Sequence, residues 1–279
     1  KTTRIGIAPI KVSYLEGATS TKFSDTPTEY MTLIPTVYNA DTLGIRPDLI
    51  GGCSAGSLVG ACWAAGVSGD RMEEIALQVR DSEIIDLVQG NSPRGMVTGQ
   101  SLQNFVSQSL RGRQIESFAT PFAAVATRYP TGDLAVLKSG DPGFAVRASC
   151  SIPGIFVPPS LNGQEYLDGG LVSPIPVRTA RQLGADMVVA VDVGGADPGA
   201  DRNGGLYELL QRSFEIMSNS LRTNELATAD VVIRPDVARI SSTDFSSRKT
   251  FIAAGFMAGN RLGPVILERM ASGKALRRG

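Results

Sequence analysis

The stretch Gly52-Cys53-Ser54-Ala55-Gly56 constrains this chain more than any other. It follows a short apolar segment at 47–50, typical of the end of a buried strand, and it precedes 57–65, whose small and apolar residues are typical of a packed helix. A strand, a tight turn and a helix with serine at the apex form a nucleophile elbow, in which the serine hydroxyl stands clear of the sheet. The stretch therefore predicts that Ser54 is a nucleophile. A plain turn with two packing glycines is the alternative.

No histidine occurs in the 279 residues. A Ser-His-Asp triad needs imidazole to accept the serine proton, so this chain cannot hold one, and its base must be a carboxylate or a lysine. Asp168 is the candidate, because it lies between a short strand pattern at 165–168 and the glycine turn that follows. The alternative is an aspartate that only caps a turn. Asp192, at the end of the strand-like run 187–193, is a competing carboxylate that we interpret as structural.

Composition excludes several classes of protein. Lys and Arg number 27 and so do Asp and Glu, and their dispersal excludes a nucleic-acid footprint. The longest apolar runs fall short of the ~20 residues of a membrane-spanning helix. Cys53, Cys62 and Cys150 lack metal-ligand spacing, which favours reduced thiols in a cytoplasmic protein without metal or cofactor. The chain opens on an apolar strand pattern at 4–10 rather than a signal peptide. Since the sequence does not begin with Met, it leaves open whether a signal peptide has been removed.

Strand and helix patterns alternate along the whole chain. Strands are expected at 4–10, 47–50, 121–127, 134–137, 165–168, 187–193 and 231–233, with 121–127 and 134–137 forming a hairpin. Helices are expected at 37–44, 57–65, 71–79, 99–110, 141–151, 206–227 and 251–270. A further helix is expected to end at 183, and 82–88 is a short amphipathic stretch. Residues 11–36 show no clear period and are expected to form a long loop. The alternation predicts one α/β domain over 1–279, with a mainly parallel sheet.

With the elbow, the Asp168-Gly169-Gly170 turn and the missing histidine in hand, the chain resembles the patatin-like phospholipases, most closely the small bacterial single-domain members. The matching stretches are 47–66, 122–132, 146–154, 166–176 and 183–192, and more loosely 241–255. The resemblance implies a three-layer α/β/α sandwich that hydrolyses acyl esters of lipids with a Ser-Asp dyad. Ser54 matches the nucleophile of the family and Asp168 its base. The resemblance also places Arg147, Ser149 and Ser151 near the site. The alternative is that these three residues only terminate a helix.

The chain departs from the family pattern after its first strand. Members of the family carry a glycine-rich loop there, and its N–H groups form the oxyanion hole. Here Pro9 removes a donor, and Gly17 is the only glycine between Gly6 and Gly44. We expect the Ala55 N–H to be one oxyanion donor and the loop after the first strand to supply the second, once substrate or an interface orders it. There are three alternatives to an oxyanion hole formed in this way. Another loop segment supplies the donors, the activity is weak, or this state of the chain is inactive.

The apolar segment 155–159, between a helix stop and the strand that ends at Asp168, is the candidate acyl-chain wall, with Ile155 and Phe156 as substrate-binding residues. Core packing is the alternative. The expected function is a serine acyl hydrolase whose partners are a lipid substrate and, transiently, a membrane surface. A non-catalytic binding or regulatory protein on the same fold is a second hypothesis, and an acyltransferase or thioesterase is a third. The oligomeric state does not follow from the sequence.

Overall fold

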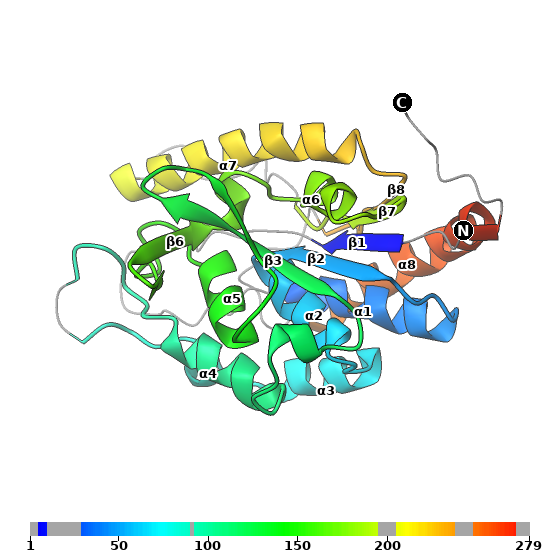
Figure 1. Ribbon diagram of the computed structural model, residues 1–279, viewed down its shortest axis with the longest axis horizontal. Helices are drawn as coiled ribbons and strands as arrows, with labels where there is room; N and C mark the ends of the chain where they lie inside the picture. The colour runs from blue at the N-terminus through cyan, green and yellow to red at the C-terminus, as the bar shows by residue number, and fades with distance from the viewer. Residues whose placement is uncertain (1–4, 10–28, 90–91, 195–204, 238–247, 272–279) are drawn as a thin grey trace.

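The computed structural model describes residues 5–9, 29–89, 92–194, 205–237 and 248–271. Its centre is a mixed eight-stranded sheet in the order β5-β6-β3-β2-β1-β7-β8, with β4 paired to β3 (Figure 1). The strands are β1 (Ile5–Pro9), β2 (Leu49–Cys53), β3 (Phe122–Tyr129), β4 (Leu134–Leu137), β5 (Ser160–Leu161), β6 (Gln164–Asp168), β7 (Met187–Val191) and β8 (Val231–Ile233).

The middle of the sheet is parallel. β3, β2, β1, β7 and β8 each pair in parallel with the next, whereas β4, β5 and β6 join antiparallel beside β3. Parallel neighbours need crossover connections, which are usually helical, and this explains the alternation in the sequence. The predicted mainly parallel sheet and the hairpin of β3 and β4 are confirmed.

Helices cover both faces of the sheet. They are α1 (Glu29–Thr42), α2 (Ala55–Ala64), α3 (Gly69–Gln78), α4 (Gln100–Ser109), α5 (Pro142–Ser149), α6 (Val177–Gln182), α7 (Leu206–Leu226) and α8 (Arg248–Ala271). In Figure 1, α6 and α7 lie on one side of the sheet, and α1, α2 and α5 lie on the other. This is the α/β/α sandwich that the sequence predicts.

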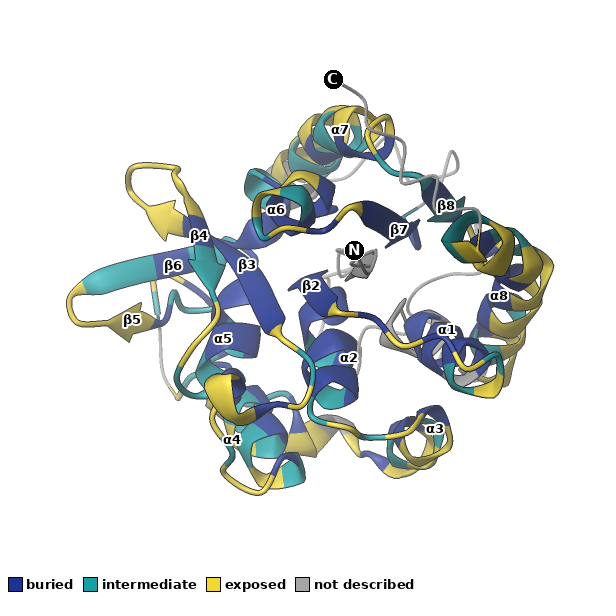
Figure 2. Ribbon diagram, turned by 45° about the vertical axis from the view of Figure 1, so that its right-hand side comes forward, coloured by how far each residue is buried: buried dark blue, intermediate teal, exposed yellow. Residues whose placement is uncertain are grey.

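Two hydrophobic cores lie on the two faces of the sheet. Along β7, Met187 and Val189 belong to the larger core with α1 and α2, while Val188 and Ala190 belong to the core under α6. All five residues of β7 are buried, because side chains alternate between two covered faces. Figure 2 shows the same burial for β2 and β3 at the middle of the sheet.

The first helix is longer than predicted. We expected a loop over 11–36 and a helix over 37–44, but α1 already begins at Glu29. Pro35 lies inside this helix and hides its period in the sequence. Leu33 and Val37 are buried in the core and α1 packs along α8, so tertiary contacts maintain the helix across the proline. Residues 10–28 of the expected loop lie outside the described residues.

Smaller differences concern element ends. The strand before the elbow continues from 49 to Cys53, and the following helix already begins at Ala55, so only Ser54 separates the two. The stretch 82–88 is not a regular helix. It contains one short 3-10 turn, Asp81–Glu83, and Leu87 forms an isolated antiparallel bridge with Val97.

Within the described ranges one helix, α8 over Lys249–Ala271, is long and apolar enough to cross a membrane by length and composition alone. The sequence analysis expected no such segment from the lengths of its apolar runs. Phe251, Ala258 and Ile266 of α8 are buried in the larger core, and the helix packs along α1. A helix that covers a hydrophobic core passes the same test, so this observation is weak evidence for a membrane span.

Candidate active site

Ser54 forms a one-residue turn between β2 and α2. Its backbone has φ 51° and ψ −126°, a region that residues with a side chain rarely adopt and that costs about 1–3 kcal/mol. A Cβ atom added at Gly52 would lie 2.4 Å from the carbonyl oxygen of Gly56, so this close approach requires glycine at position 52. Strand, strained serine and helix together have the geometry of a nucleophile elbow.

The turn is held by two serine hydroxyls. The backbone N–H of Ser54 donates to Ser149 Oγ at 2.8 Å, and that hydroxyl donates to the Val125 carbonyl at 2.6 Å. Ser57 Oγ donates to the Ser54 carbonyl at 2.6 Å. Ser149 and Ser57 are fully buried. Ser149 therefore links the elbow to strand β3, which makes it a positioning residue that the sequence analysis placed near the site only by resemblance.

Replacing Ser149 with alanine is expected to destabilise the fold by about 1–3 kcal/mol, because the buried Ser54 N–H loses its acceptor. The strained turn then relaxes and activity at Ser54 falls as well. Urea unfolding and esterase assays on the same preparation measure both effects. Ser151→Ala is the matched control, since Ser151 follows α5 and its hydroxyl donates to the Arg147 carbonyl of that helix. Equal losses in both variants contradict the positioning role of Ser149.

Sheet pairing brings Asp168 next to the elbow. β4 occupies one edge of β3, so β2 and β6 share the other edge. β2 ends at Cys53 opposite Val125, and β6 ends at Asp168 opposite the next residue, Ala126. β2 is parallel to β3 and β6 is antiparallel to it, so the two strands run toward each other along this edge. Their last residues therefore lie next to each other. Cys53 Sγ lies 3.9 Å from Asp168 Oδ1, and Ser54 is the next residue.

Hydrogen bonds hold the backbone and one carboxylate oxygen of Asp168. Asp168 Oδ1 accepts the Gly170 N–H at 2.6 Å. The Asp168 N–H donates to the Ser151 carbonyl at 2.8 Å, and its carbonyl accepts the Thr127 hydroxyl at 2.7 Å. The residue is 2% exposed. These contacts fix the carboxylate in one position within the protein, as a positioned base requires.

The first glycine of the Asp168-Gly169-Gly170 turn has a steric cause. A Cβ atom at Gly169 would lie 2.3 Å from the Val125 carbonyl oxygen and 3.0 Å from Cys53 Sγ. Backbone atoms cannot yield by that much, so any larger residue at position 169 would push the turn away from β3 and from the elbow. The motif is therefore explained by the close packing of the β6 end against the β2 end.

Cys150 lies next to the elbow, with its Sγ 4.0 Å from Ser57 Oγ. Its pKa is raised to about 12 by burial and by the charge of Asp168, and hydrogen bonds with the Ser57 and Ser54 side chains partly oppose this shift. Burial also raises the pKa of Cys62 to about 12. All three cysteines are free thiols, in agreement with the sequence analysis.

Cys62 and Cys150 are expected to resist alkylation in the native protein. With a pKa of about 12, the thiolate fraction at pH 8 is roughly 1,000-fold below that of an ordinary thiol, and only the thiolate reacts. Peptide mapping after iodoacetamide treatment, with and without urea, measures this. The same shift lowers stability as the pH rises from about 9 toward 12, because only the unfolded chain releases these protons. Rapid native labelling at either cysteine contradicts the raised pKa values.

One oxyanion donor is available from the described residues. Ala55 is the first residue of α2, and the first N–H groups of a helix have no acceptor within it and lie at its positive end. The expected second donor was the loop after the first strand. β1 ends at Pro9, paired with Val191, and residues 10–28 lie outside the described residues. The second donor therefore stays a prediction.

The side chains of Arg147 and Asp192 form hydrogen bonds or ion pairs that connect elements of the fold. The Arg147 guanidinium donates to the Thr98 carbonyl at 2.7 Å and to the Gln100 and Gln103 side chains, and so ties α5 to α4. Asp192 is buried at the end of β7, where Arg234 and Arg222 lie 3.1 and 3.5 Å from its carboxylate oxygens. This arrangement agrees with the structural role expected for Asp192.

The two residues expected to form the acyl-chain wall differ in burial: Ile155 is buried and Phe156 is half-buried. Ile155 is 1% exposed and packs with Val97 and Ile152 in a small cluster beside the site, which fits the core-packing alternative. Phe156 is half-buried on the edge of the same cluster. Of the two residues, only Phe156 therefore has surface with which an acyl chain can make contact.

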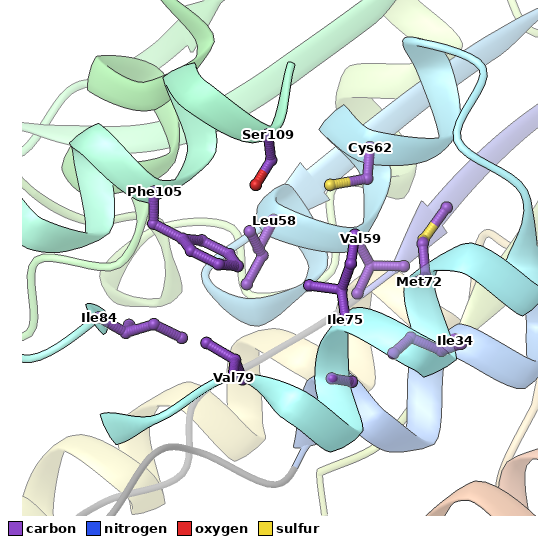
Figure 3. A pocket seen from close by; sticks show the side chains of 11 residues that line it. Ile34, Leu58, Val59, Cys62, Met72, Ile75, Val79, Ile84, Phe105 and Ser109 are labelled. Atoms are coloured by element: carbon purple, nitrogen blue, oxygen red, sulfur yellow. The ribbon is translucent and has the colours of Figure 1, made fainter. Parts of the chain in front are cut away.

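A small cavity lies along α2, beyond the elbow. Its volume is about 40 Å³, and its wall includes Leu58, Val59 and Cys62 of α2, Ile75 of α3 and Phe105 of α4 (Figure 3). The sequence analysis did not predict this cavity, because the residues that line it come from helices that are separate in the sequence. The space is apolar and holds only a few water-sized volumes, so we assign it no ligand. Among the described residues, no group of three or more His, Cys, Asp or Glu side chains is placed to hold a metal ion.

A model of one protein family, described as patatin-like phospholipase, matches residues 36–181, just over half of the chain. The chain belongs to the patatin-like phospholipase family. The match spans the elbow, β3, α5 and Asp168, and it begins after the first strand, where the sequence departs from the family pattern.

Curated relatives include patatin-like phospholipase domain-containing protein 6 of Mus musculus, 31% identical over 55% of this chain and 12% of its own length. An uncharacterised NTE family protein of Mycobacterium bovis is 30% identical over 56% of this chain and 44% of its own. Another, from Mycobacterium tuberculosis, is 28% identical over 77% and 41%. The chain thus spans less than half the length of these relatives. VipD from Legionella pneumophila shares the fold, with a TM-score of 0.51 and 13% identity over 94% of this chain and 66% of VipD.

Proposed function

We propose that this chain hydrolyses carboxylic esters of lipids, with Ser54 as nucleophile and Asp168 as general base. One observation carries the proposal: β2 and β6 end side by side on one edge of β3, and these ends bear Ser54 and Asp168. Membership of the patatin-like phospholipase family supports lipid acyl esters as the substrate class. Esterase, phospholipase A and lysophospholipase activities all fall within this proposal.

In the proposed reaction, the Asp168 carboxylate accepts the proton of the Ser54 hydroxyl while Ser54 Oγ attacks the ester carbonyl carbon. The Ala55 N–H and the positive end of α2 stabilise the oxyanion that forms. The intermediate collapses to an acyl-serine ester, and the alcohol leaves with the proton held on Asp168. A water molecule then attacks the acyl-serine while Asp168 accepts its proton, and Asp168 passes this proton to Ser54 Oγ as the intermediate collapses and fatty acid is released. Each cycle returns both side chains to their starting states.

A non-catalytic binding or regulatory protein is the second candidate, favoured by the glycine-poor sequence after β1 and by Pro9 at its end. Release of fatty acid from matched oxygen ester and thioester substrates separates the possibilities. The proposed hydrolase releases acid from the oxygen esters. Turnover of thioesters alone supports the thioesterase or acyltransferase hypothesis, and no turnover of either substrate by folded protein supports the binding protein.

Phe156→Ala is expected to raise KM for long acyl chains more than for short ones, because the half-buried ring offers apolar surface beside the site. A series of p-nitrophenyl esters of increasing acyl length measures this dependence. Val97→Ala is the control, since its side chain is fully buried in the same cluster and makes no surface contact. An equal effect of Phe156→Ala on all chain lengths contradicts the acyl wall and favours core packing.

A further inference from the structure

The outer side of α7 carries four large apolar residues in contact with solvent. Leu209, Leu210, Ile216 and Met217 are 63%, 50%, 63% and 62% exposed. They form two adjacent pairs seven residues apart, and residues at that spacing lie on the same side of a helix. We call this set the α7 apolar face. Figure 2 shows exposed residues recurring along α7 at the rim of the molecule.

From Leu209 to Asn224, the charged residues of α7 are all held in ion pairs. Arg212 and Glu215, partly buried, pair with each other, and Arg222 pairs with the buried Asp192. The remaining exposed residues of this side are Ser213, Ser220, Thr223 and Asn224. An exposed helix side in water normally carries charged residues, so this pattern is unusual for a surface that faces only water.

Two exposed hydroxyl groups on this side are satisfied within the helix itself. Ser213 Oγ donates to the Leu209 carbonyl at 2.8 Å, and Thr223 Oγ1 donates to the Asn219 carbonyl at 3.0 Å. Hydroxyl groups that bond back to their own helix do not require water. The side can therefore be covered by an apolar medium without leaving these donors unpaired.

The α7 apolar face lies beside the candidate active site. Phe214, on the inner side of α7, packs on the cluster that contains Ile152 and Phe156. Ile152 follows Ser151, whose carbonyl accepts the Asp168 N–H. The turn after Asp168 also contacts α7. One side of α7 therefore packs next to the proposed base, while the opposite side presents apolar residues to the surroundings.

We propose that the α7 apolar face docks on the surface of a lipid bilayer, with α7 lying in the plane of the interface. Its continuity with the site argues for lipid as the occupant, and this step rests on the proposed function, because a lipid ester must be drawn from such a surface. An interfacial helix binds through buried apolar area and through charge. Since the charged residues of this stretch of α7 are paired within the protein, binding depends on apolar contact and does not require anionic lipid.

The test measures binding of the Ser54→Ala protein to phosphatidylcholine vesicles by flotation, at low and at high salt. The Ser54→Ala protein with an unaltered α7 is expected to float with the vesicles under both conditions. The double variant Ile216→Gln/Met217→Gln is expected to lower the partition coefficient at least about tenfold, because two apolar anchors are lost while glutamine preserves the helix. Phe256→Gln/Met257→Gln on α8 is the matched control, since Phe256 and Met257 are also exposed apolar neighbours.

Several results overturn the proposal. These are no binding by the protein with an unaltered α7, binding that disappears at high salt, or equal losses in the α7 and α8 variants. If sedimentation shows a dimer that the α7 double variant dissociates, the face is an interface between two copies instead. Vesicle binding uses a chain that cannot hydrolyse, so failure of the proposed function is detected separately, with a soluble ester and the wild-type chain.

Discussion

Replacing Ser54 with alanine is expected to lower ester hydrolysis by about 1,000-fold or more while the fold is retained. The nucleophilic oxygen is lost, and removal of a nucleophile costs rates of this order in other serine hydrolases. The turn itself depends on contacts of the Ser54 backbone with Ser149 and Ser57, which alanine preserves. The initial rate on a soluble ester, compared at equal concentrations of folded protein, measures the effect.

Ser220→Ala is the control for this experiment, because Ser220 lies exposed on α7. It is expected to keep the wild-type rate and the wild-type unfolding midpoint. Hydrolysis that persists in a purified and folded Ser54→Ala protein removes Ser54 from the mechanism.

The Asp168→Asn variant is expected to lose at least about 100-fold in rate, because an amide cannot accept the serine proton and the chain holds no histidine to replace the base. The amide oxygen can still accept the Gly170 N–H, so the turn after β6 keeps its shape. Two residues that act as one unit give non-additive losses. The Ser54→Ala/Asp168→Asn double variant is therefore expected to be little slower than either single variant.

Asp192→Asn is the matched control, since Asp192 is the other buried aspartate at the end of a strand. It loses ion pairs with Arg222 and Arg234, so we expect lower stability with an unchanged rate per folded molecule. Losses that add in the double variant, or an equal loss in rate for Asp192→Asn, contradict the assignment of Asp168 as base.

The elbow and the sheet class could be predicted from the sequence because both rest on local patterns. Apolar runs of strand length separated by helical periods predict a parallel sheet, and glycines two residues on either side of Ser54 predict the turn. The pairing of β6 with β3 is long-range and antiparallel, so no local pattern contains it. Only that pairing explains why Asp168, rather than Asp192, ends next to Ser54.

Other parts of the site and fold depend on contacts that a single sequence does not encode locally. The beginning of α1 was missed, because Pro35 breaks the helical pattern and packing against α8 outweighs it. The role of Ser149 follows from one hydroxyl placed between Ser54 and β3, which no spacing indicates. A helix over 206–227 was predicted, but the neighbouring elements decide which of its apolar residues are covered.

The central claim is that Ser54 is an activated nucleophile and that Asp168 activates it. Labelling of the native chain with a fluorophosphonate probe, followed by peptide mass spectrometry, tests this claim most directly, because the probe forms a bond only with an activated serine. We predict a phosphonate adduct on Ser54 that is absent in the Ser54→Ala variant and strongly reduced in Asp168→Asn. A folded wild-type chain with no adduct, or with an adduct on another residue, contradicts the account.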